Sequence, residues 1–463
     1  MHLPKISDLT LVLTERCNMN CAFCYVPKQA RSMPVDLALE AVDWLVDQAP
    51  KGSQPSIGFF GGEPLLAADL LNKVVAHGRK RRGDDIRFTM PTNGTLVDRE
   101  AADALERGGV ELALSVDDAT VSAKGGEQHT LAGVEENLEQ LRRFAPTVRV
   151  TVTPDNVENL FETIIRIYQA GFQKIMHQPA LEVAWPQEAL ETWRAQHEAL
   201  ADWSCERLAR GEAIPELVVL EGIIARLGGQ AQGYCGAGVR MGAVDPEGRV
   251  FACYRSVYDP QADRLVLGHL REGWVNEPLI AAYAKLHPHR AKPEEGSCQT
   301  CPARDGCTAY CPAMGHALLG DLRAVPANAC HLMKIQVEIC RDLDRRVRQI
   351  QRRRRRRVGS RVAAAALALG LADGSLGCDS RTPASTSDAA LIDGAHLDKN
   401  PNFEGPGVCA VYLEPPPDFT PGLCARPHIF IPDSPAVKDS RVTPGLCPVP
   451  APDAALVLSA HAI

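Results

Sequence analysis

The sequence predicts an α/β protein: a partial (βα)6 barrel, then a small cysteine-rich domain, then a largely irregular C-terminal tail. Three observations support this prediction. Short apolar runs alternate with amphipathic stretches up to about residue 215, cysteines cluster between residues 235 and 330, and Pro, Ala and Asp are abundant after residue 379. Strands that alternate with helices form parallel βαβ units. The expected domains are the barrel at 1–215, the cysteine-rich domain at 216–345, an Arg-rich linker at 346–378 and the tail at 379–463.

The composition is that of a globular protein, with 45% hydrophobic and 23% charged residues in a chain of 463 residues. This length leaves room for two or three domains. The net charge of −7 argues against a nucleic-acid partner. No run of about 20 apolar residues is present and no signal peptide precedes the first strand, so we expect no transmembrane helix and a cytoplasmic protein. The 16 cysteines are clustered, which favours metal binding over disulfides.

The barrel strands are predicted from six short apolar runs. Between them, apolar residues recur at helical spacing, as they do in 37–46, 131–144 and 157–170. In such barrels the functional groups lie at the carboxyl ends of the strands. The candidate strands are Leu9–Thr14, Ser56–Phe60, Ile86–Met90, Glu111–Val116, Thr147–Val152 and Lys174–Gln178.

Three cysteines, Cys17, Cys21 and Cys24, stand on one loop directly after the first strand, in the spacing CxxxCxxC. Three thiolates on one loop suit a soft metal or an iron–sulfur cluster. Three ligands for a four-iron cluster leave one iron without a protein ligand, and that iron is free to bind a small molecule. A structural zinc site is the alternative, although such sites normally have four protein ligands.

This loop resembles the signature of the radical S-adenosylmethionine (SAM) enzymes. The resemblance implies that the open iron chelates the amino and carboxylate groups of SAM. Reductive cleavage of SAM then yields a 5′-deoxyadenosyl radical that abstracts a hydrogen atom. The resemblance also implies a set of SAM contacts, although a glycine turn and a helix cap are alternative explanations for some of them. These implied contacts are Phe23, Gly62, Glu63, Asn93, Ser115 and Asp117.

Seven further cysteines follow the barrel, and a hairpin predicted over residues 243–251 brings the first two of them together. Their order resembles the SPASM extension of radical SAM peptide and protein maturases, which carries two auxiliary [4Fe-4S] clusters. A pair of zinc sites is the alternative. The stretch 228–234, where relatives often supply a fourth ligand to the first cluster, contains no cysteine. The resemblance implies Cys235, Cys253 and Cys311 for the first auxiliary cluster, and Cys298, Cys301, Cys307 and Cys330 for the second.

The resemblance covers about residues 8–340 and implies a radical SAM oxidoreductase that modifies a peptide or protein, with a thioether crosslink as one such product. Tyr254 and Arg255 stand where sulfatase-maturing relatives carry a catalytic Asp, which argues against sulfatase maturation. This pair either contacts substrate or faces solvent. Two other functions stay open: the same architecture acting on a small molecule or tetrapyrrole, and a non-catalytic, metal-stabilised binding protein.

The expected partners follow from the same resemblance. They are a peptide or protein substrate and a reductant such as flavodoxin or ferredoxin. Because the sequence shows no leader-peptide-binding domain before the first strand, we also expect a separate peptide-capture protein or capture by the tail. His177, at the end of the sixth strand, is either a substrate contact or an ordinary loop histidine, and Cys205 is expected to be a small buried hydrophobe.

The C-terminal third carries features that do not belong to a barrel. The arginine block Arg352–Arg357 precedes the apolar run Val362–Ala372, which is interpreted either as a signal-like segment or as a basic amphiphilic linker. A PG(V/L)C unit then occurs three times, ending at Cys409, Cys424 and Cys447. These repeats predict either a peptide substrate fused to its own enzyme or a small secreted domain joined to the chain by gene arrangement or gene-model error.

Overall fold

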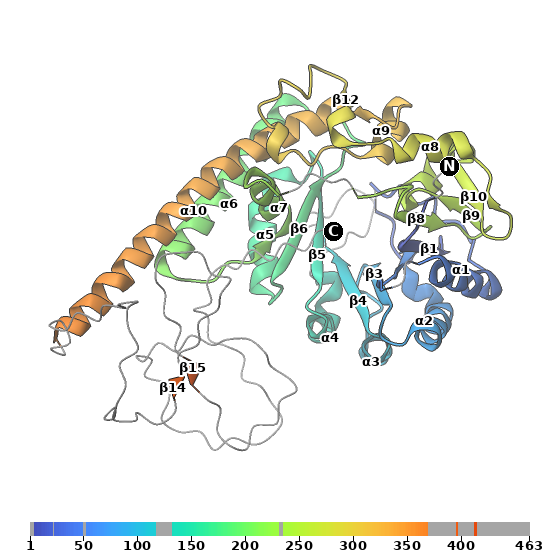
Figure 1. Ribbon diagram of the computed structural model, residues 1–463, viewed down its shortest axis with the longest axis horizontal. Coiled ribbons are helices and arrows are strands. Elements are labelled where there is room, and N and C mark those ends of the chain that lie inside the picture. Colours follow the sequence, from blue (N-terminus) through green and yellow to red (C-terminus); the bar gives the residue numbers. More distant parts are fainter. Residues whose placement is uncertain are drawn as a thin grey trace, which may run out of the picture. The chain divides into compact units, whose positions relative to one another are not determined.

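Figure 1 shows a computed structural model of the chain. The structure describes residues 4–21, 23–49, 52–116, 132–230 and 235–368, and also 395–396 and 412–413. The chain divides into two compact units, of which one includes Met1–Val358 and the other Gly359–Pro450. All the candidate site residues discussed below lie in the first unit.

The barrel part is built from parallel strands whose order in the sheet follows their order in the sequence. Each strand pairs with its predecessor because an intervening helix returns the chain to the same end of the sheet. The predicted βα alternation is therefore confirmed. The strands are β1 (Asp8–Thr14), β2 (Ser56–Gly61), β3 (Arg87–Thr92), β4 (Val110–Ser115), β5 (Thr147–Val152), β6 (Lys174–Pro179) and β7 (Glu216–Leu217).

Helices form an outer layer on the convex face of this sheet (Figure 1). The first helix illustrates the cause, because its apolar residues from Leu37 to Leu45 recur at helical spacing and are buried. The helices predicted at 131–144 and 157–170 are present, and each begins with a 3₁₀ turn, η2 (Ala132–Asn137) and η3 (Val157–Asn159). The α-helices of this layer are α1 (Val35–Gln48), α2 (Ala68–Arg82), α3 (Arg99–Gly108), α4 (Leu138–Arg143), α5 (Leu160–Gln169), α6 (Gln187–Arg210) and α7 (Val218–Leu227).

The cysteine-rich part continues the sheet of the barrel. The predicted hairpin is confirmed as β8 (Met241–Val244) and β9 (Arg249–Phe251), which pair antiparallel. Strand β8 also pairs in parallel with β1, so the hairpin extends the barrel sheet on the side of β1. The cysteine-rich part also contains β10 (Val266–His269), β11 (Gly273–Trp274), β12 (Lys292–Pro293), β13 (Ala324–Val325), α8 (Glu277–Ala284), α9 (Pro312–Leu319), and the 3₁₀ turns η4 (Tyr254–Tyr258), η5 (Ala262–Leu265), η6 (Pro288–Arg290) and η7 (Arg304–Gly306). In the barrel part, the 3₁₀ turn η1 (Pro64–Ala67) follows β2.

The long helix α10 (Ala327–Ala368) runs through the position where the sequence predicts a linker. The predicted boundary at 345/346 falls inside this helix, because the Arg-, Gln- and Leu-containing segment has good helix formers and no proline. Among the described residues, no helix is both long and apolar enough to cross a membrane. The repeat cysteines Cys409, Cys424 and Cys447 lie outside the described residues.

His177 has a structural place that neither sequence interpretation gave. Its neighbours on β6, Met176 and Gln178, line the cavity described below, so His177 points to the opposite face of the strand. It is fully buried, and its Nε2 lies 2.9 Å from Nε2 of His197 on α6. The Nδ1 atom of His197 lies 2.8 Å from the carbonyl oxygen of Trp193, and Nε2 of Gln336 on α10 lies 3.1 Å from His197 Nε2. His177 therefore links β6 to α6 through His197, which in turn contacts α10, and it faces away from the cavity.

This buried histidine pair predicts acid sensitivity. Burial lowers the pKa of His197 to about 4, and burial together with His197 lowers the pKa of His177 well below its usual value. In the unfolded chain a histidine has a pKa of about 6.5. Below this pH the histidines of the unfolded state are protonated, whereas the buried histidines of the folded state stay neutral. We expect the free energy of unfolding to fall by about 3 kcal/mol between pH 6.5 and 4 through His197 alone.

Denaturant titrations of wild type and His197→Gln across this range measure the effect. The variant should show a flatter dependence on pH, whereas His331→Gln, at a histidine that pairs with Glu295 near the surface, should keep the wild-type slope. Parallel curves for wild type and His197→Gln would contradict this prediction.

Candidate active site

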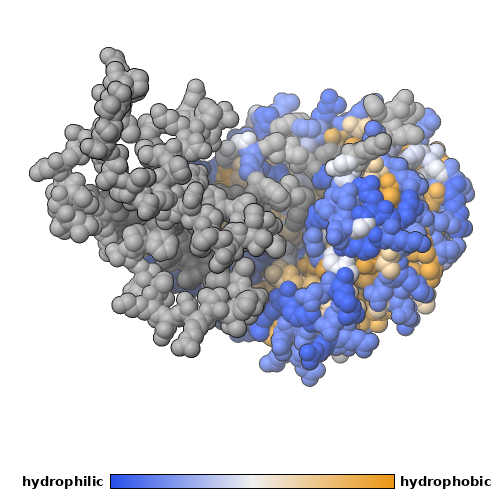
Figure 2. All heavy atoms as spheres, turned by 60° about the horizontal axis from the view of Figure 1, so that its bottom comes forward, coloured by the Kyte–Doolittle hydropathy of each residue, from blue (hydrophilic) through white to orange (hydrophobic). Residues whose placement is uncertain are grey.

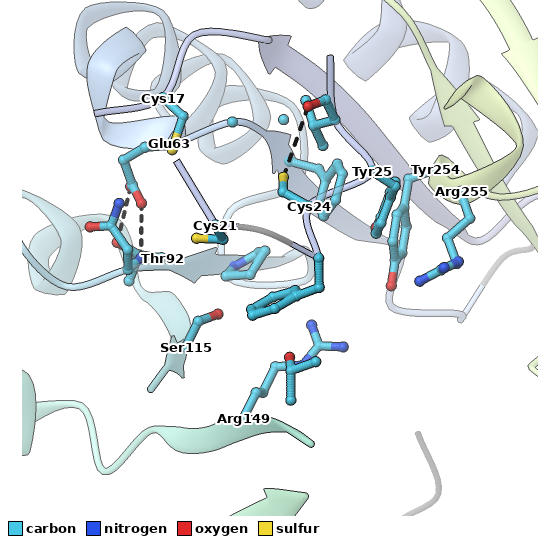
Figure 3. A pocket seen from close by; sticks show the side chains of 18 of the residues that line it. Cys17, Cys21, Cys24, Tyr25, Glu63, Thr92, Ser115, Arg149, Tyr254 and Arg255 are labelled. Carbon is cyan, nitrogen blue, oxygen red and sulfur yellow. Dashed lines mark hydrogen bonds between the residues drawn. The ribbon is translucent and has the colours of Figure 1, made fainter. Parts of the chain in front are cut away.

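A cavity of about 250 Å³ opens at the carboxyl ends of the barrel strands. Figure 3 shows that cysteines from the loop after β1 lie on one side of it, with Ser115 and Arg149 below them and Tyr25, Tyr254 and Arg255 at the opposite side. The cavity wall thus combines residues of the barrel with residues that directly follow the β8–β9 hairpin. The site is assembled from both parts of the chain.

The three cysteines of the CxxxCxxC loop all line this cavity, as the sequence predicts. The loop turns tightly between the last two, because the backbone N–H of Cys24 donates to the carbonyl of Cys21 at 3.2 Å. Burial raises the pKa of the Cys17 thiol, and the charges of Glu63 and Cys24 act in the same direction. Negative charges that share a site disfavour the ionised form of a thiol. A bound metal centre has the opposite effect and favours the thiolate.

Gly61 and Gly62 bring the end of β2 into close contact with the start of the cysteine loop. A Cβ atom on Gly61 would lie 1.8 Å from the Thr14 carbonyl oxygen, and one on Gly62 would lie 2.1 Å from that of Arg16. In their place, the N–H of Gly62 donates to Thr14 at 2.8 Å and the N–H of Glu63 donates to Arg16 at 2.9 Å. The glycines are therefore required to place the loop, whatever they contact in addition.

The Glu63 carboxylate connects two of the loops around the cavity. Its side chain is buried, and it accepts hydrogen bonds from the Leu65 N–H (3.1 Å), the Thr92 hydroxyl (3.0 Å) and the Asn93 N–H (2.8 Å). Burial raises the pKa of this carboxyl despite these donors. A carboxylate has about four lone-pair positions, so three internal hydrogen bonds leave one for a ligand ammonium group.

Asn93 and Ser115 also line the cavity, at the ends of β3 and β4. The Asn93 amide donates to Asn18 Oδ1 at 2.9 Å, which ties the β3 loop to the cysteine loop. Phe23 borders the same cavity, whereas Asp117 lies outside the described residues. Five of the six SAM contacts implied by the resemblance are therefore found around one cavity.

Arg149 is a cavity residue that the sequence interpretation missed. It lies on β5 beside Ser115 of β4, and its guanidinium donates a hydrogen bond to the Tyr254 hydroxyl oxygen. Among the described residues, no carboxylate forms an ion pair with Arg149. The signal was present in the sequence, because a single arginine interrupts the apolar strand Thr147–Val152. A charged residue at such a position points to a polar site at the sheet edge.

An aromatic wall of the cavity is formed by Tyr25, Phe60 and Tyr254. Figure 3 shows Tyr25 and Tyr254 on the side of the cavity away from Glu63. The ring centroids of Phe60 and Tyr254 lie 4.3 Å apart, and those of Tyr25 and Phe60 lie 6.4 Å apart. The Arg255 guanidinium lies 4.3 Å from the centre of the Tyr25 ring and pairs with Glu182, which follows β6. Tyr254 and Arg255 therefore line the cavity and are not a solvent-facing pair.

The other seven cysteines are brought together in two groups. Burial raises the pKa of Cys253, and the charges of Cys311 and Cys235 raise it further. Burial raises the pKa of Cys330 to about 11, with further contributions from Cys307, Cys298 and Cys301. These are the same two groups that the resemblance implies, and all-thiol groups suit iron–sulfur clusters. Residues 231–234, just upstream of Cys235, lie outside the described residues.

The two cysteine groups and the cysteine loop are not compact enough for a single metal ion. Within the part of the chain that the structure describes, no three Cys, His, Asp or Glu side chains lie close enough together to hold one ion.

Comparisons with known proteins identify relatives of this chain. Residues 11–168 match the Radical SAM superfamily. The mycofactocin maturase MftC of Mycobacterium ulcerans is 28% identical over 323 residues, which cover 66% of this chain and 82% of that protein. The PqqA peptide cyclase of Xanthomonas euvesicatoria is 26% identical over 340 residues, covering 69% of this chain and 86% of that protein. Native anSMEcpe with bound AdoMet and Cp18Cys peptide has a similar fold, with a TM-score of 0.59 and 17% identity over 75% of this chain and all of that chain.

The Radical SAM domain and the relatives named as a maturase and a cyclase indicate that this chain is an enzyme. The domain match covers residues 11–168, and the similarity to the relatives extends beyond the barrel into the cysteine-rich part. The family, the fold class and the enzymatic nature predicted from the sequence are therefore confirmed. A Radical SAM domain implies a [4Fe-4S] cluster and SAM as cofactors.

Proposed function

We propose that this chain is a radical SAM maturase that modifies a peptide or protein. The observation that carries the proposal is the cavity itself, which joins a three-cysteine loop to Tyr254 and Arg255 of the cysteine-rich part. Relatives named as a peptide cyclase and a maturase match this chain over more than four-fifths of their own lengths. A small-molecule or tetrapyrrole substrate is the second candidate, but no observation of this structure favours it.

In this proposal the barrel side of the cavity holds the cofactors. Cys17, Cys21 and Cys24 ligate the [4Fe-4S] cluster, which supplies the electron for SAM cleavage when both are bound. The remaining lone-pair position of Glu63 suits the methionine ammonium group. Arg149 and Ser115, side by side on neighbouring strands, suit the methionine carboxylate, because a guanidinium binds a carboxylate through paired hydrogen bonds.

Phe23 and Asn93 are proposed to contact the adenine and the ribose, because the resemblance implies these contacts and both residues line the cavity. The aromatic wall then lies where a substrate side chain meets the radical. Its rings exclude water from this position, which protects a reactive intermediate from side reactions. The ion pair of Arg255 with Glu182 closes the same region.

The two further cysteine groups are proposed to hold two auxiliary [4Fe-4S] clusters. Their support is the grouping of Cys235, Cys253 and Cys311 apart from the other four cysteines. The auxiliary sites accept or pass electrons or bind the substrate. External electrons come from a reductant such as flavodoxin or ferredoxin. Substrate delivery depends on a separate capture protein or on the tail of this chain, whose PG(V/L)C units resemble a repeated substrate sequence.

One experiment tests this function with the full chain, reconstituted anaerobically with iron and sulfide. We expect about twelve iron atoms per chain, from three four-iron clusters. With reductant and SAM the protein should form 5′-deoxyadenosine, and mass spectrometry of coexpressed candidate peptides and of the chain itself should reveal the product. Loss of paired hydrogens near Cys409, Cys424 or Cys447 would identify the tail as substrate.

The outcome that contradicts the proposal is equally specific. About eight iron atoms per chain, with all ten site cysteines intact, would eliminate one auxiliary site. Formation of 5′-deoxyadenosine together with modification of a small molecule, and of no peptide, would favour the second candidate function.

A further inference from the structure

The cysteine loop has a narrow neck that the proposed chemistry does not explain. Thr14 and Ser32 form an antiparallel bridge, and the N–H of Met33 donates to the Leu13 carbonyl at 2.8 Å. The N–H of Glu15 donates to the Arg31 carbonyl at 2.9 Å. The backbone thus closes the loop at residues 13–15 and 31–33, on either side of the three cysteines.

A charged pair lies across this neck. The Arg31 guanidinium donates from Nε to Glu15 Oε2 at 2.8 Å and from Nη2 to Glu15 Oε1 at 2.5 Å, which is the two-bond arrangement that arginine forms with carboxylates. The Glu15 side chain is 0% exposed, and Arg31 is the cation that pairs with it. A buried carboxylate depends on such a partner, because removal of one member leaves an uncompensated charge.

The same guanidinium reaches the cysteine-rich part of the protein. Its Nη1 donates to Glu247 Oε1 at 2.9 Å, and Glu247 lies in the turn of the β8–β9 hairpin. This turn is itself fixed, because the N–H groups of Glu247 and Arg249 both donate to the buried Asp245 carboxylate. Arg31 therefore connects a rigid turn, the neck of the loop and the end of β1.

We propose that Arg31 is a positioning residue that holds the Cys17–Cys24 loop in its cluster-binding shape and fixes it against the β8–β9 hairpin. This inference rests on the proposed role of Cys17, Cys21 and Cys24 as cluster ligands. The contact with Glu15 closes the neck, and the contact with Glu247, which is 45% exposed, is the weaker second anchor. Residues that orient metal ligands in this way typically change metal affinity by about 10- to 100-fold when replaced.

The test follows the reduced cluster of the full chain by electron paramagnetic resonance (EPR) while a chelator removes iron. The signal to follow is the part that changes when SAM is added, because the proposed SAM contacts line the same cavity as Cys17, Cys21 and Cys24. We expect Arg31→Gln to lose this signal at least about tenfold faster than wild type. Arg31→Lys should recover part of the loss, and Glu247→Gln should show only a small effect.

A matched control distinguishes an effect on the cysteine loop from the effect of losing any contact between the barrel and the cysteine-rich part. Arg271 also joins the cysteine-rich part to the barrel, through Asp36 and Glu40 of α1, but it does not touch the loop. Arg271→Gln should retain the SAM-dependent signal at the wild-type rate. A wild-type rate in Arg31→Gln, or equal losses in the Arg31 and Arg271 variants, would overturn the inference.

A second variant covers the case in which Arg31→Gln does not fold. The double variant Glu15→Gln/Arg31→Met removes both charges together, so no unpaired carboxylate remains buried. It should melt close to wild type and still lose the SAM-dependent signal faster, and retention at the wild-type rate would overturn the inference. If wild type itself shows no SAM-dependent signal, the cluster assignment fails, and this outcome is distinct from every result with the variants.

Discussion

Replacement of Cys17, Cys21 or Cys24 by Ala is expected to abolish the formation of 5′-deoxyadenosine from SAM under reducing conditions. The three thiols line one cavity together with the proposed SAM contacts, and each variant removes one of three proposed ligands that have no substitute on the loop. Chromatography of the reaction mixture measures the nucleoside directly. Activity should fall below detection in each variant.

The chain offers two matched controls for this experiment. Cys205 is buried among residues of α6 and α10, and Cys340 Sγ lies 3.7 Å from the Leu220 carbonyl oxygen, away from the cavity. Cys205→Ala and Cys340→Ala should both retain SAM cleavage, with at most a modest loss of stability from the smaller side chain. Formation of the nucleoside by the triple variant of Cys17, Cys21 and Cys24 would show that the cluster lies elsewhere.

The second large effect is expected at the auxiliary cysteines. Cys301→Ala should leave SAM cleavage largely intact but abolish modification of the peptide, so that 5′-deoxyadenosine accumulates without product. The reason is position, since Cys301 belongs to the group with Cys298, Cys307 and Cys330 and is not a lining residue of the cavity. Quantifying nucleoside and product in the same reaction measures the uncoupling.

A different result at Cys301 would assign a different role to this group. Equal loss of both activities, accompanied by a lower melting temperature, would indicate that the second auxiliary site maintains the fold, since metal binding and folding are coupled. Full retention of both activities would eliminate a functional site at these four cysteines.

Much of this architecture could be predicted from local sequence. The barrel strands begin and end within a residue or two of the apolar runs, because alternating burial in a parallel sheet leaves a strong pattern. The hairpin at 243–251 was predictable for the same reason. The CxxxCxxC loop was predictable because its ligands are close in sequence.

The features that were missed depend on contacts between distant residues. The pairing of β1 with β8 joins segments more than 200 residues apart, and neither strand indicates its partner. The role of Glu63 in binding Leu65, Thr92 and Asn93 became visible only when β2 and β3 were placed side by side. Arg149 was missed because the residues around it predict only a strand, and the local sequence does not show what the single charge faces.

The pairing of β1 with β8 also has a mechanical consequence. A hinge requires a connection that bends freely, whereas here backbone hydrogen bonds from Asp8 to Leu11 join the hairpin to the strand that precedes the cysteine loop. The separation between the loop and the start of the cysteine-rich part is consequently set by strand geometry, so an electron passed between the proposed clusters would cross a constant distance in every turnover. Entry of a bulky substrate is then not expected to involve rotation of one half of the enzyme against the other.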